Sequence, residues 1–238
     1  MVNIDTVYQK VLAFANKEQR GYITPQEFNL FANQAQSEIF ESYFHNIINQ
    51  AKKPTNSHVY ADVDQSLEER IRVFEKVYGV NAILSLPNVG SNTKVKRIDP
   101  NIVYRINRIE FNKIECELLS TNNFNQVRQA GPLMKPTNSR PISNVRNNQI
   151  RAVGSNDQLI LPTGIFYFSK PTKPSWGYFV VGGKALHDSS QAKTTHFELH
   201  PSEESELVYK ILKFAGISMK QQDITQAGQG LETAQNQQ

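Results

Sequence analysis

The sequence predicts an α+β protein, because its hydrophobic periodicity changes along the chain. Over the first 79 residues apolar side chains recur at helical spacing, and from about residue 80 to 200 short apolar runs alternate with turn residues, as in strands. A last helical pattern opens at Pro201. We therefore expect a helical bundle region at 1–79, a β-rich region at 80–200, a C-terminal helix at 201–220 that packs back on the core, and a flexible Gln-rich tail at 221–238.

The N-terminal region predicts two helices. Apolar residues from Ile4 to Ala15 define the first, and Gly21 ends that segment. The run Thr24-Pro25-Gln26-Glu27 predicts the start of a second, long helix through a capping box, in which Thr24 and Glu27 satisfy each other's backbone amides. The second helix carries two neighbouring apolar stripes, Phe28, Phe31, Ala35, Ile39, Tyr43 and Ile47, and Leu30, Phe40, Phe44 and Ile48. Such a wide apolar surface requires either further helices or another subunit to cover it.

The remaining elements follow in order. A third helix is expected from Ser66 through Tyr78, ending at Gly79. A β-hairpin of 103–110 and 114–118 turns at Asn112-Lys113. The next expected elements are a short helix at 121–129, a stretch at 131–148 that is largely loop, and strands at 150–153, 158–161, 165–169 and 178–181, with a turn at Gly182-Gly183. The last helix is expected to be interrupted at Gly216, and its buried face consists of Leu207, Val208, Ile211, Leu212 and Ala215.

Composition excludes several classes of protein. The 238 residues carry 26 Lys and Arg against 22 Asp and Glu, a formal charge of +4, and 22 Asn and 19 Gln make the chain rich in uncharged hydrogen-bonding side chains. No apolar run is long enough to span a bilayer, and Asp5 stands where a signal peptide needs basic and then apolar residues, so we expect no membrane partner. A single cysteine, Cys116, excludes an internal disulfide framework, and we expect it to be a buried structural thiol.

Motifs for catalysis or cofactor binding are missing from the sequence. The stretch from Asn16 to Glu27 resembles a calcium loop at Gly21 and Glu27, but Arg20 places a cation where calcium would bind. His196 and His200 precede the last helix and do not share one of its faces. There is no nucleophile elbow, phosphate loop or dinucleotide fingerprint. We therefore expect no enzymatic activity, no cofactor and no metal.

Basic residues cluster in two stretches that contain few acids. Their members are Lys94, Lys96 and Arg97, with Arg105 and Arg108, and then Arg128, Lys135, Arg140, Arg146 and Arg151. One interpretation is a surface that faces nucleic-acid phosphates, and the other is an ordinary solvated face. Aromatic residues that could stack on bases are not interleaved with these cations, which argues against sequence reading.

Trp176 and the acidic start of the last helix have simple structural explanations. Trp176 is expected to anchor the core or a loop. Glu203, Glu204 and Glu206 fall in the first turn of the last helix, where the helix dipole favours negative charge without any partner.

The second half of the chain carries an ordered series of short motifs. They are Val103-Tyr104-Arg105-Ile106, Lys135-Pro136-Thr137, Arg140-Pro141, Phe166-Tyr167-Phe168, the stretch from Lys170 to Tyr178, Ala185-Leu186-His187-Asp188, Phe197-Glu198-Leu199-His200 and the stretch from Ser202 to Leu212. Together with the segment from Asn16 to Phe28, this series resembles the head-to-tail connector or ring (adaptor) proteins of tailed bacteriophages, short-tailed or crAss-like.

The resemblance implies a virion structural protein, made in the bacterial cytoplasm, that forms a homo-oligomeric ring, twelvefold by the same resemblance, below the portal and around the DNA channel. Its partners would be copies of itself, the portal and neighbouring tail or ring proteins, with passive contact to packaged DNA. Three residue sets would serve these contacts: intersubunit packing through Phe28, Phe31, Ile39, Phe40, Tyr43 and Phe44, a basic channel surface of Lys94, Lys96, Arg97, Arg128, Lys135, Arg140 and Arg146, and a tail that docks on the neighbouring ring through Gln221, Gln222, Gln226 and Gln229.

Other functions remain open from the sequence. Another phage tail component, such as a tail tube or hub protein, fits the same resemblance. A sequence-nonspecific nucleic-acid-binding module fits the basic stretches alone. An enzyme fits the sequence least of the three.

Overall fold

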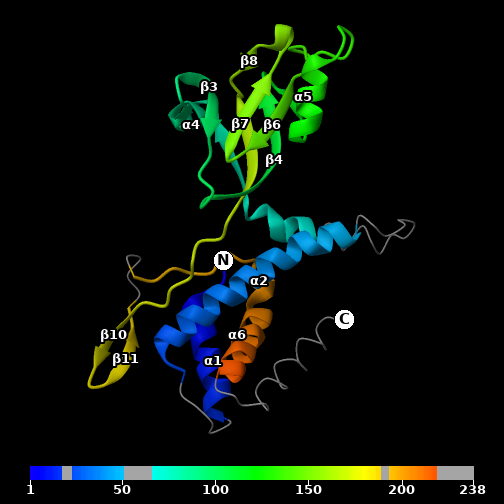
Figure 1. Ribbon diagram of the computed structural model, residues 1–238. Coiled ribbons are helices and arrows are strands. Elements are labelled where there is room, and N and C mark those ends of the chain that lie inside the picture. The colour runs from blue at the N-terminus through cyan, green and yellow to red at the C-terminus, as the bar shows by residue number, and fades with distance from the viewer. Residues whose placement is uncertain (18–22, 51–65, 189–192, 219–238) are drawn as a thin grey trace. The chain divides into compact units, whose positions relative to one another are not determined.

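The computed structural model describes residues 1–17, 23–50, 66–188 and 193–218, and its mixture of helices and strands confirms the α+β prediction. The chain divides into two compact units (Figure 1). The helical unit contains 1–73 and the segment from residue 171 onward, and the β-rich unit contains 74–170. The sequence of the β-rich unit is thus inserted within that of the helical unit, and the predicted region 80–200 includes residues of both. The predicted tail at 221–238 lies outside the described residues.

Three long helices build the helical unit. They are α1 (Ile4–Lys17), α2 (Pro25–Gln50) and α6 (Glu204–Ser218), which follows a 3-10 turn, η2 (Pro201–Glu203). The helix α6 packs on both α1 and α2. Its predicted apolar face is confirmed, because Leu207, Val208, Ile211, Leu212 and Ala215 are all buried. The predicted interruption at Gly216 is wrong, since α6 continues through that residue to Ser218.

The capping box at the start of α2 is confirmed. The Thr24 amide and hydroxyl donate to Glu27 Oε2 at 3.0 and 2.7 Å, and the Glu27 amide donates to Thr24 Oγ1 at 3.3 Å. Hydrogen bonds from the backbone and then the side chain of Thr24 lower the pKa of Glu27, because they favour the charged carboxylate. This local signal fixes where α2 begins.

The prediction of a third helix as far as Tyr78 is wrong in its second half. Residues 66–72 are helical, but β1 (Glu75–Gly79) then pairs antiparallel with β9 (Gly164–Ser169), with Tyr78 opposite Ile165. Tyr78 stacks on Tyr167 with ring centroids 4.5 Å apart. The pairing with a strand almost 90 positions away outweighs the local helical spacing. A local sequence pattern cannot reveal such a distant pairing.

A single sheet of nine strands forms most of the β-rich unit, in the order β1-β9-β4-β5-β6-β7-β3-β2 with β8 also paired to β7. The bounds of its other strands are β2 Asn88–Val89, β3 Asn92–Arg97, β4 Val103–Phe111, β5 Ile114–Leu118, β6 Ile142–Arg146, β7 Gln149–Val153 and β8 Leu159–Ile160. Two helices accompany it, α4 (Val80–Ser85) and α5 (Thr121–Gln129), with a 3-10 turn η1 at Ser155–Asp157. The main core lies on one face of the sheet and includes Ile83, Ile106, Ile109, Cys116, Ile150, Ile165 and Tyr167.

Asparagine-containing turns join two of the hairpins. Asn112 and Lys113 between β4 and β5 have φ of 49° and 67°, and Asn147 and Asn148 between β6 and β7 have φ of 51° and 59°. Asn tolerates this left-handed region better than most residues, so both turns follow from the sequence. The first hairpin and the helix at 121–129 are confirmed, and the stretch 131–148 is largely loop as predicted, except that it contains the strand β6, which the sequence analysis did not foresee. Prolines in the first part of that stretch favour a loop, and they precede a strand that pairs with β7 directly after it and with the earlier strand β5.

Side-chain amides of α2 hold an extended segment of the helical unit. Asn29 Oδ1 accepts from the Trp176 amide at 2.7 Å, and Asn29 Nδ2 donates to the Trp176 carbonyl at 3.3 Å. Seven residues along the same helix, buried Gln36 donates to the Thr172 carbonyl at 2.8 Å and accepts from the Glu198 amide at 3.1 Å. Residues seven apart lie on one face of a helix, so the two amides together hold the segment 172–176 against α2.

We predict that Gln36→Ala destabilises the helical unit by about 2–4 kcal/mol, because it leaves the Thr172 carbonyl and the Glu198 amide without partners in a partly buried site. Gln34→Ala on the exposed side of α2 is the matched control and should cost less than about 0.5 kcal/mol. Urea unfolding followed by circular dichroism measures both. Equal losses of stability in the two variants would contradict the clamp.

Candidate functional site

The apolar residues of α2 are covered within the chain. Phe28, Ile39, Phe40, Tyr43 and Phe44 are all buried, and Phe31 is half-buried. The expectation that these residues pack against another subunit is therefore corrected: the helical unit itself, with α6 against α2, covers the buried five. Burial raises the pKa of Tyr43, with the nearby Glu203 carboxylate as the next cause.

The acidic residues at the start of α6 have partners inside the helical unit. Arg70 approaches Glu203 at 2.7 Å, Lys10 approaches Glu204 at 2.5 Å, and Lys210 lies 3.6 Å from Glu206. Glu203 is buried, so its pairing with Arg70 fastens the helix at 66–72 to the start of α6. The dipole argument alone therefore missed the main role of these carboxylates.

One predicted surface cation, Lys96, is buried. Its ammonium group donates to the carbonyls of Leu84 and Leu86 at 3.1 and 3.3 Å and to Asn88 Oδ1 at 2.8 Å. These three acceptors come from α4 and the segment that follows it, so Lys96 ties that segment to β3. Lys96 is a structural residue, and its assignment to a basic surface was wrong.

Two further members of the predicted basic surface are neutralised by acids. Arg128 makes a two-point contact with Asp157 at 2.5 and 2.6 Å, which lowers the pKa of that carboxyl through the hydrogen bond. Arg140 lies 3.4 Å from Glu117. The pairs join residues 29 and 23 positions apart, so the sequence could not show them. Lys135 is exposed in the loop that follows α5.

Three arginines of the β-rich unit come together on one face of the sheet. The Cα partners of Gln149 are Arg97 on β3 and Arg146 on β6, and Arg151 lies two residues along β7. Paired residues point to the same face of a sheet, as do residues two apart along a strand. All three arginines are exposed, and we call this set the arginine face. The predicted basic channel surface included Arg97 and Arg146, whereas Arg151 was named only as a member of the basic stretch. Alternation of residues along the strand, through Gln149, opposite Arg146, and Arg151, was the signal that could have grouped all three.

The arginine face carries no acidic residue on the described strands that form it. Asn144 also lies on this face, because it is the Cα partner of Arg151, and its side chain donates to the Leu119 carbonyl at 2.9 Å. Leu119 precedes the N-cap of α5, Ser120, so the positive end of that helix lies next to the same face. Arg151 donates to Gln149 Oε1 at 3.4 Å.

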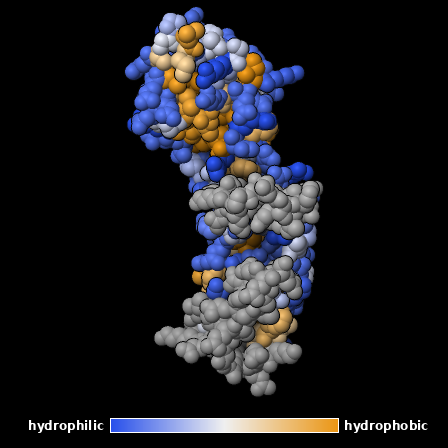
Figure 2. Space-filling view, turned by 90° about the vertical axis from the view of Figure 1, so that its right-hand side faces the viewer, coloured by the Kyte–Doolittle hydropathy of each residue, from blue (hydrophilic) through white to orange (hydrophobic). Residues whose placement is uncertain are grey.

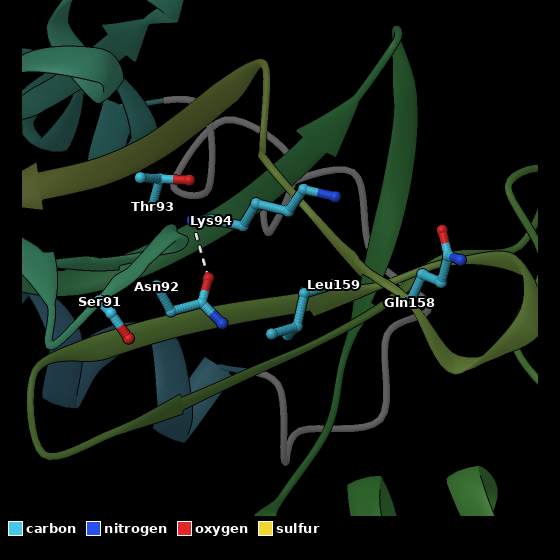
Figure 3. Close-up of a pocket in the computed structure, with 6 residues that line it drawn as sticks. All are labelled: Ser91, Asn92, Thr93, Lys94, Gln158 and Leu159. Carbon is cyan, nitrogen blue, oxygen red and sulfur yellow. Dashed lines mark hydrogen bonds between the residues drawn. The ribbon is translucent and has the colours of Figure 1, made fainter.

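A shallow depression in the β-rich unit lies near Lys94 (Figure 3). Its volume is about 520 Å³, it is open to solvent, and it is lined by Ser91, Asn92, Thr93, Lys94, Gln158 and Leu159. Asn92 Oδ1 is already engaged by the Lys94 amide at 3.0 Å. An open, mostly polar depression of this kind does not enclose a small ligand.

Trp176 anchors a hairpin of the helical unit, as predicted. It is buried, its indole donates to Asp5 Oδ1 at 2.9 Å, and its ring contacts those of Tyr8, Tyr178 and His187. Tyr178 and His187 are paired residues at the base of the hairpin formed by β10 (Tyr178–Val181) and β11 (Lys184–His187). The predicted turn is confirmed, since Gly182 and Gly183 have φ of 58° and 79°. The base of the hairpin is thus fixed to α1 and α2.

Beyond its base, this hairpin is apolar and exposed. Phe179, Val180, Val181 and Leu186 are 45%, 64%, 56% and 46% exposed. The strands β10 and β11 pair only with each other among the described residues. Figure 1 shows the hairpin standing apart from α1, α2 and α6, and we call it the hairpin arm. Sequence reasoning predicted the hairpin but not its exposure.

The β-rich unit also exposes apolar side chains, and Figure 2 shows hydrophobic residues gathered on one of its faces. The exposed large hydrophobic residues of this unit are Val77, Val80, Leu84, Ile102, Tyr104, Ile114, Leu118, Leu133 and Met134. This unit exposes more large apolar side chains than the scattered single residues found on most protein surfaces. Exposure of this extent is typical of a protein that contacts other proteins.

The single cysteine is buried, and the described residues contain no cluster of metal-ligating side chains. Cys116 is buried, and burial raises the pKa of its thiol to about 11, so the confirmed structural thiol is a poor nucleophile. Across 1–17, 23–50, 66–188 and 193–218, no three His, Cys, Asp or Glu side chains gather as a metal site. Within the same ranges no helix is both long and apolar enough to cross a membrane. Residues 18–22 of the calcium-like loop, and the tail residues Gln221, Gln222, Gln226 and Gln229, lie outside the described residues.

Comparisons with known proteins add no relatives: neither a model of a protein family nor a curated protein matches the chain.

We predict that Lys96→Met destabilises the β-rich unit by about 2–4 kcal/mol, because two carbonyls and the Asn88 amide oxygen lose their common donor. Exposed Lys94 lies two residues earlier on the same strand, and Lys94→Met should cost less than about 0.5 kcal/mol. The free energy of unfolding in urea measures both. A Lys96→Met protein as stable as Lys94→Met would show that Lys96 is an ordinary surface cation.

Proposed function

We propose that this chain is a non-enzymatic structural protein of a tailed-phage virion that assembles with copies of itself into a ring in the head-to-tail connector, below the portal and around the DNA channel. The resemblance of its sequence motifs to connector and ring proteins suggests the place in the virion. The twelvefold number of subunits and the contacts with portal and neighbouring tail proteins rest on that resemblance alone.

The observation that carries the proposal is the hairpin arm. An isolated two-stranded hairpin is at best marginally stable in water, and an exposed row of Phe179, Val180 and Val181 is costly to leave in solvent. Its base, by contrast, is fixed through Trp176, Asp5 and Asn29. A rigid base below an exposed apolar arm is the arrangement expected of a segment that inserts into a neighbouring subunit.

Ring geometry fits an arm of this kind. In a ring each subunit buries two unlike surfaces, one that reaches out and one that receives. The arm provides a projecting surface, and the buried stripe of α2, which was first expected to serve this contact, is no longer needed for it. The additional apolar residues exposed on the β-rich unit offer further contact area for neighbouring virion proteins.

A sequence-nonspecific nucleic-acid-binding module is the second candidate, and the arginine face favours it. The two functions are separable, because a module of that kind requires binding of DNA without self-assembly. Another phage tail component, such as a tube or hub, would also assemble with itself, and its position in the particle would differ.

We predict that Val180→Asp prevents ring assembly while leaving the fold intact. A carboxylate buried at an apolar contact costs about 3 kcal/mol or more, which weakens each contact by about 100-fold or more. Leu30→Asp on α2 is the matched control, since Leu30 is also 64% exposed and belongs to the same unit. Mass photometry and negative-stain microscopy of the purified chains, at rising concentration, measure the outcome.

The expected result is ring-shaped particles for the wild type and for Leu30→Asp, and monomers for Val180→Asp. Circular dichroism should give the three proteins the same melting temperature. A wild-type chain that forms no larger particle at any concentration, or a Val180→Asp chain that assembles normally, would contradict the proposal.

A further inference from the structure

We propose that the arginine face, made of Arg97, Arg146 and Arg151, is a sequence-independent contact site for the phosphate backbone of double-stranded DNA. The inference rests on the proposed function in naming DNA as the carrier of the phosphates. It is tested by binding rather than by assembly, so either can fail without the other.

The sheet register places the three guanidinium groups close together. Arg97 and Arg146 flank Gln149 from the two neighbouring strands, so their Cα atoms are about 10 Å apart, which is two interstrand spacings. Arg151 follows Gln149 by two residues, about 7 Å along β7. Double-stranded DNA carries about one charge per 1.7 Å of its axis, so about six phosphates pass such a patch. Three cations in this area can therefore contact three phosphates at once.

Across the described ranges, the three arginines of this face have no acidic partner, unlike Arg108, Arg128 and Arg140 of the same unit. Arg128 and Arg140 are paired with Asp157 and Glu117, and Arg108 lies 2.9 Å from Glu110. In the described residues no ion pair involves Arg97, Arg146 or Arg151. Three exposed cations left side by side without counter-charges repel each other, and an anionic ligand relieves that repulsion.

Among the described residues, the neighbouring acids form no ion pair with the arginines of this face. On β5, which runs parallel to β6, Glu117 is opposite Ile142, at the end of β6 away from Arg146. Asp99, two residues beyond Arg97, accepts a hydrogen bond from the Asn101 amide at 2.8 Å. Near Arg151, Asn144 connects the sheet to the residue before the α5 N-cap, whose positive helix end adds to the attraction for phosphate.

The chemistry of the face fits backbone contact rather than base reading. Its side chains are arginines with the amides Gln149 and Asn144, and no aromatic residue of β3, β6 or β7 is present to stack on bases. Phosphate contacts position a protein on DNA without reading its sequence. A contact of this kind holds DNA weakly at high salt, which suits a surface along which DNA must pass.

The test measures binding of the full-length chain to a short random-sequence DNA duplex by fluorescence anisotropy between about 50 and 200 mM salt. In the triple variant Arg97→Gln, Arg146→Gln and Arg151→Gln, affinity at the lowest salt should fall by about tenfold or more. The slope of log affinity against log salt should become shallower by about 2.7, or about 0.9 for each lost phosphate contact. A second duplex of unrelated sequence should bind the wild type equally well.

Two variants control the charge and the fold. Arg105→Gln, Lys135→Gln and Lys170→Gln remove the same charge from exposed positions outside the face and should change the slope little. Replacing the three arginines of the face by lysine should keep most of the slope, because point charges suffice for phosphate. If the triple glutamine variant does not fold, Arg151→Gln alone should still lower the slope by about 0.9.

Several outcomes would overturn the inference. They are wild-type binding that is absent at the lowest salt, a triple glutamine variant that binds as the wild type does, and a control variant that loses as much affinity. A fourth is displacement of the duplex by inorganic phosphate well beyond the effect of chloride at equal ionic strength, since the face would then be a site for free phosphate.

Discussion

The helical unit depends on backbone groups that have no strand or helix to pair with. The segment 172–176 and the stretch around Glu198 run extended beside α2, and buried or half-buried backbone amides and carbonyls need partners. Asn29 and Gln36 supply them from one face of α2, and each amide both donates and accepts. This clamp fixes Trp176, and Trp176 in turn fixes the base of the hairpin arm. The side-chain amides of Asn29 and Gln36 therefore determine where the hairpin arm is held.

The amide-rich composition acquires a more specific meaning from these contacts. The chain contains 22 Asn and 19 Gln, far more amides than its net charge of +4 would suggest for a surface that attracts partners by charge. Many of them act inside the chain: Gln36 and Asn144 are buried and bind backbone carbonyls, and Asn112, Asn147 and Asn148 adopt the left-handed conformation that tight turns require. An amide can satisfy both a donor and an acceptor without the desolvation cost of a charge, which explains its use at these positions.

Local signals predicted much of the fold, and long-range pairing explains what they missed. The capping box at Thr24, the helix at 121–129 and the turn at Gly182-Gly183 are local and were correct. The strand β1 was taken for helix because its partner β9 is almost 90 residues away. Among the basic residues, the sequence showed that cations cluster, but it could not show that Lys96 is buried, that Arg128 meets Asp157, or that Arg97 and Arg146 flank one glutamine. Burial and strand register determine where these cations lie, and neither can be read from the local sequence.

The central claim is that the hairpin arm inserts into a second copy of the same chain, and site-specific crosslinking tests it most directly. Cys116 is buried and its thiol is a poor nucleophile, so Val180→Cys creates a single reactive position for a photo-crosslinker. We predict covalent dimers and higher multiples, with the crosslinked peptide of the partner identified by mass spectrometry in mixtures of isotope-labelled and unlabelled chains. Crosslinks confined to the same chain, or none at concentrations that give larger particles, would contradict the account.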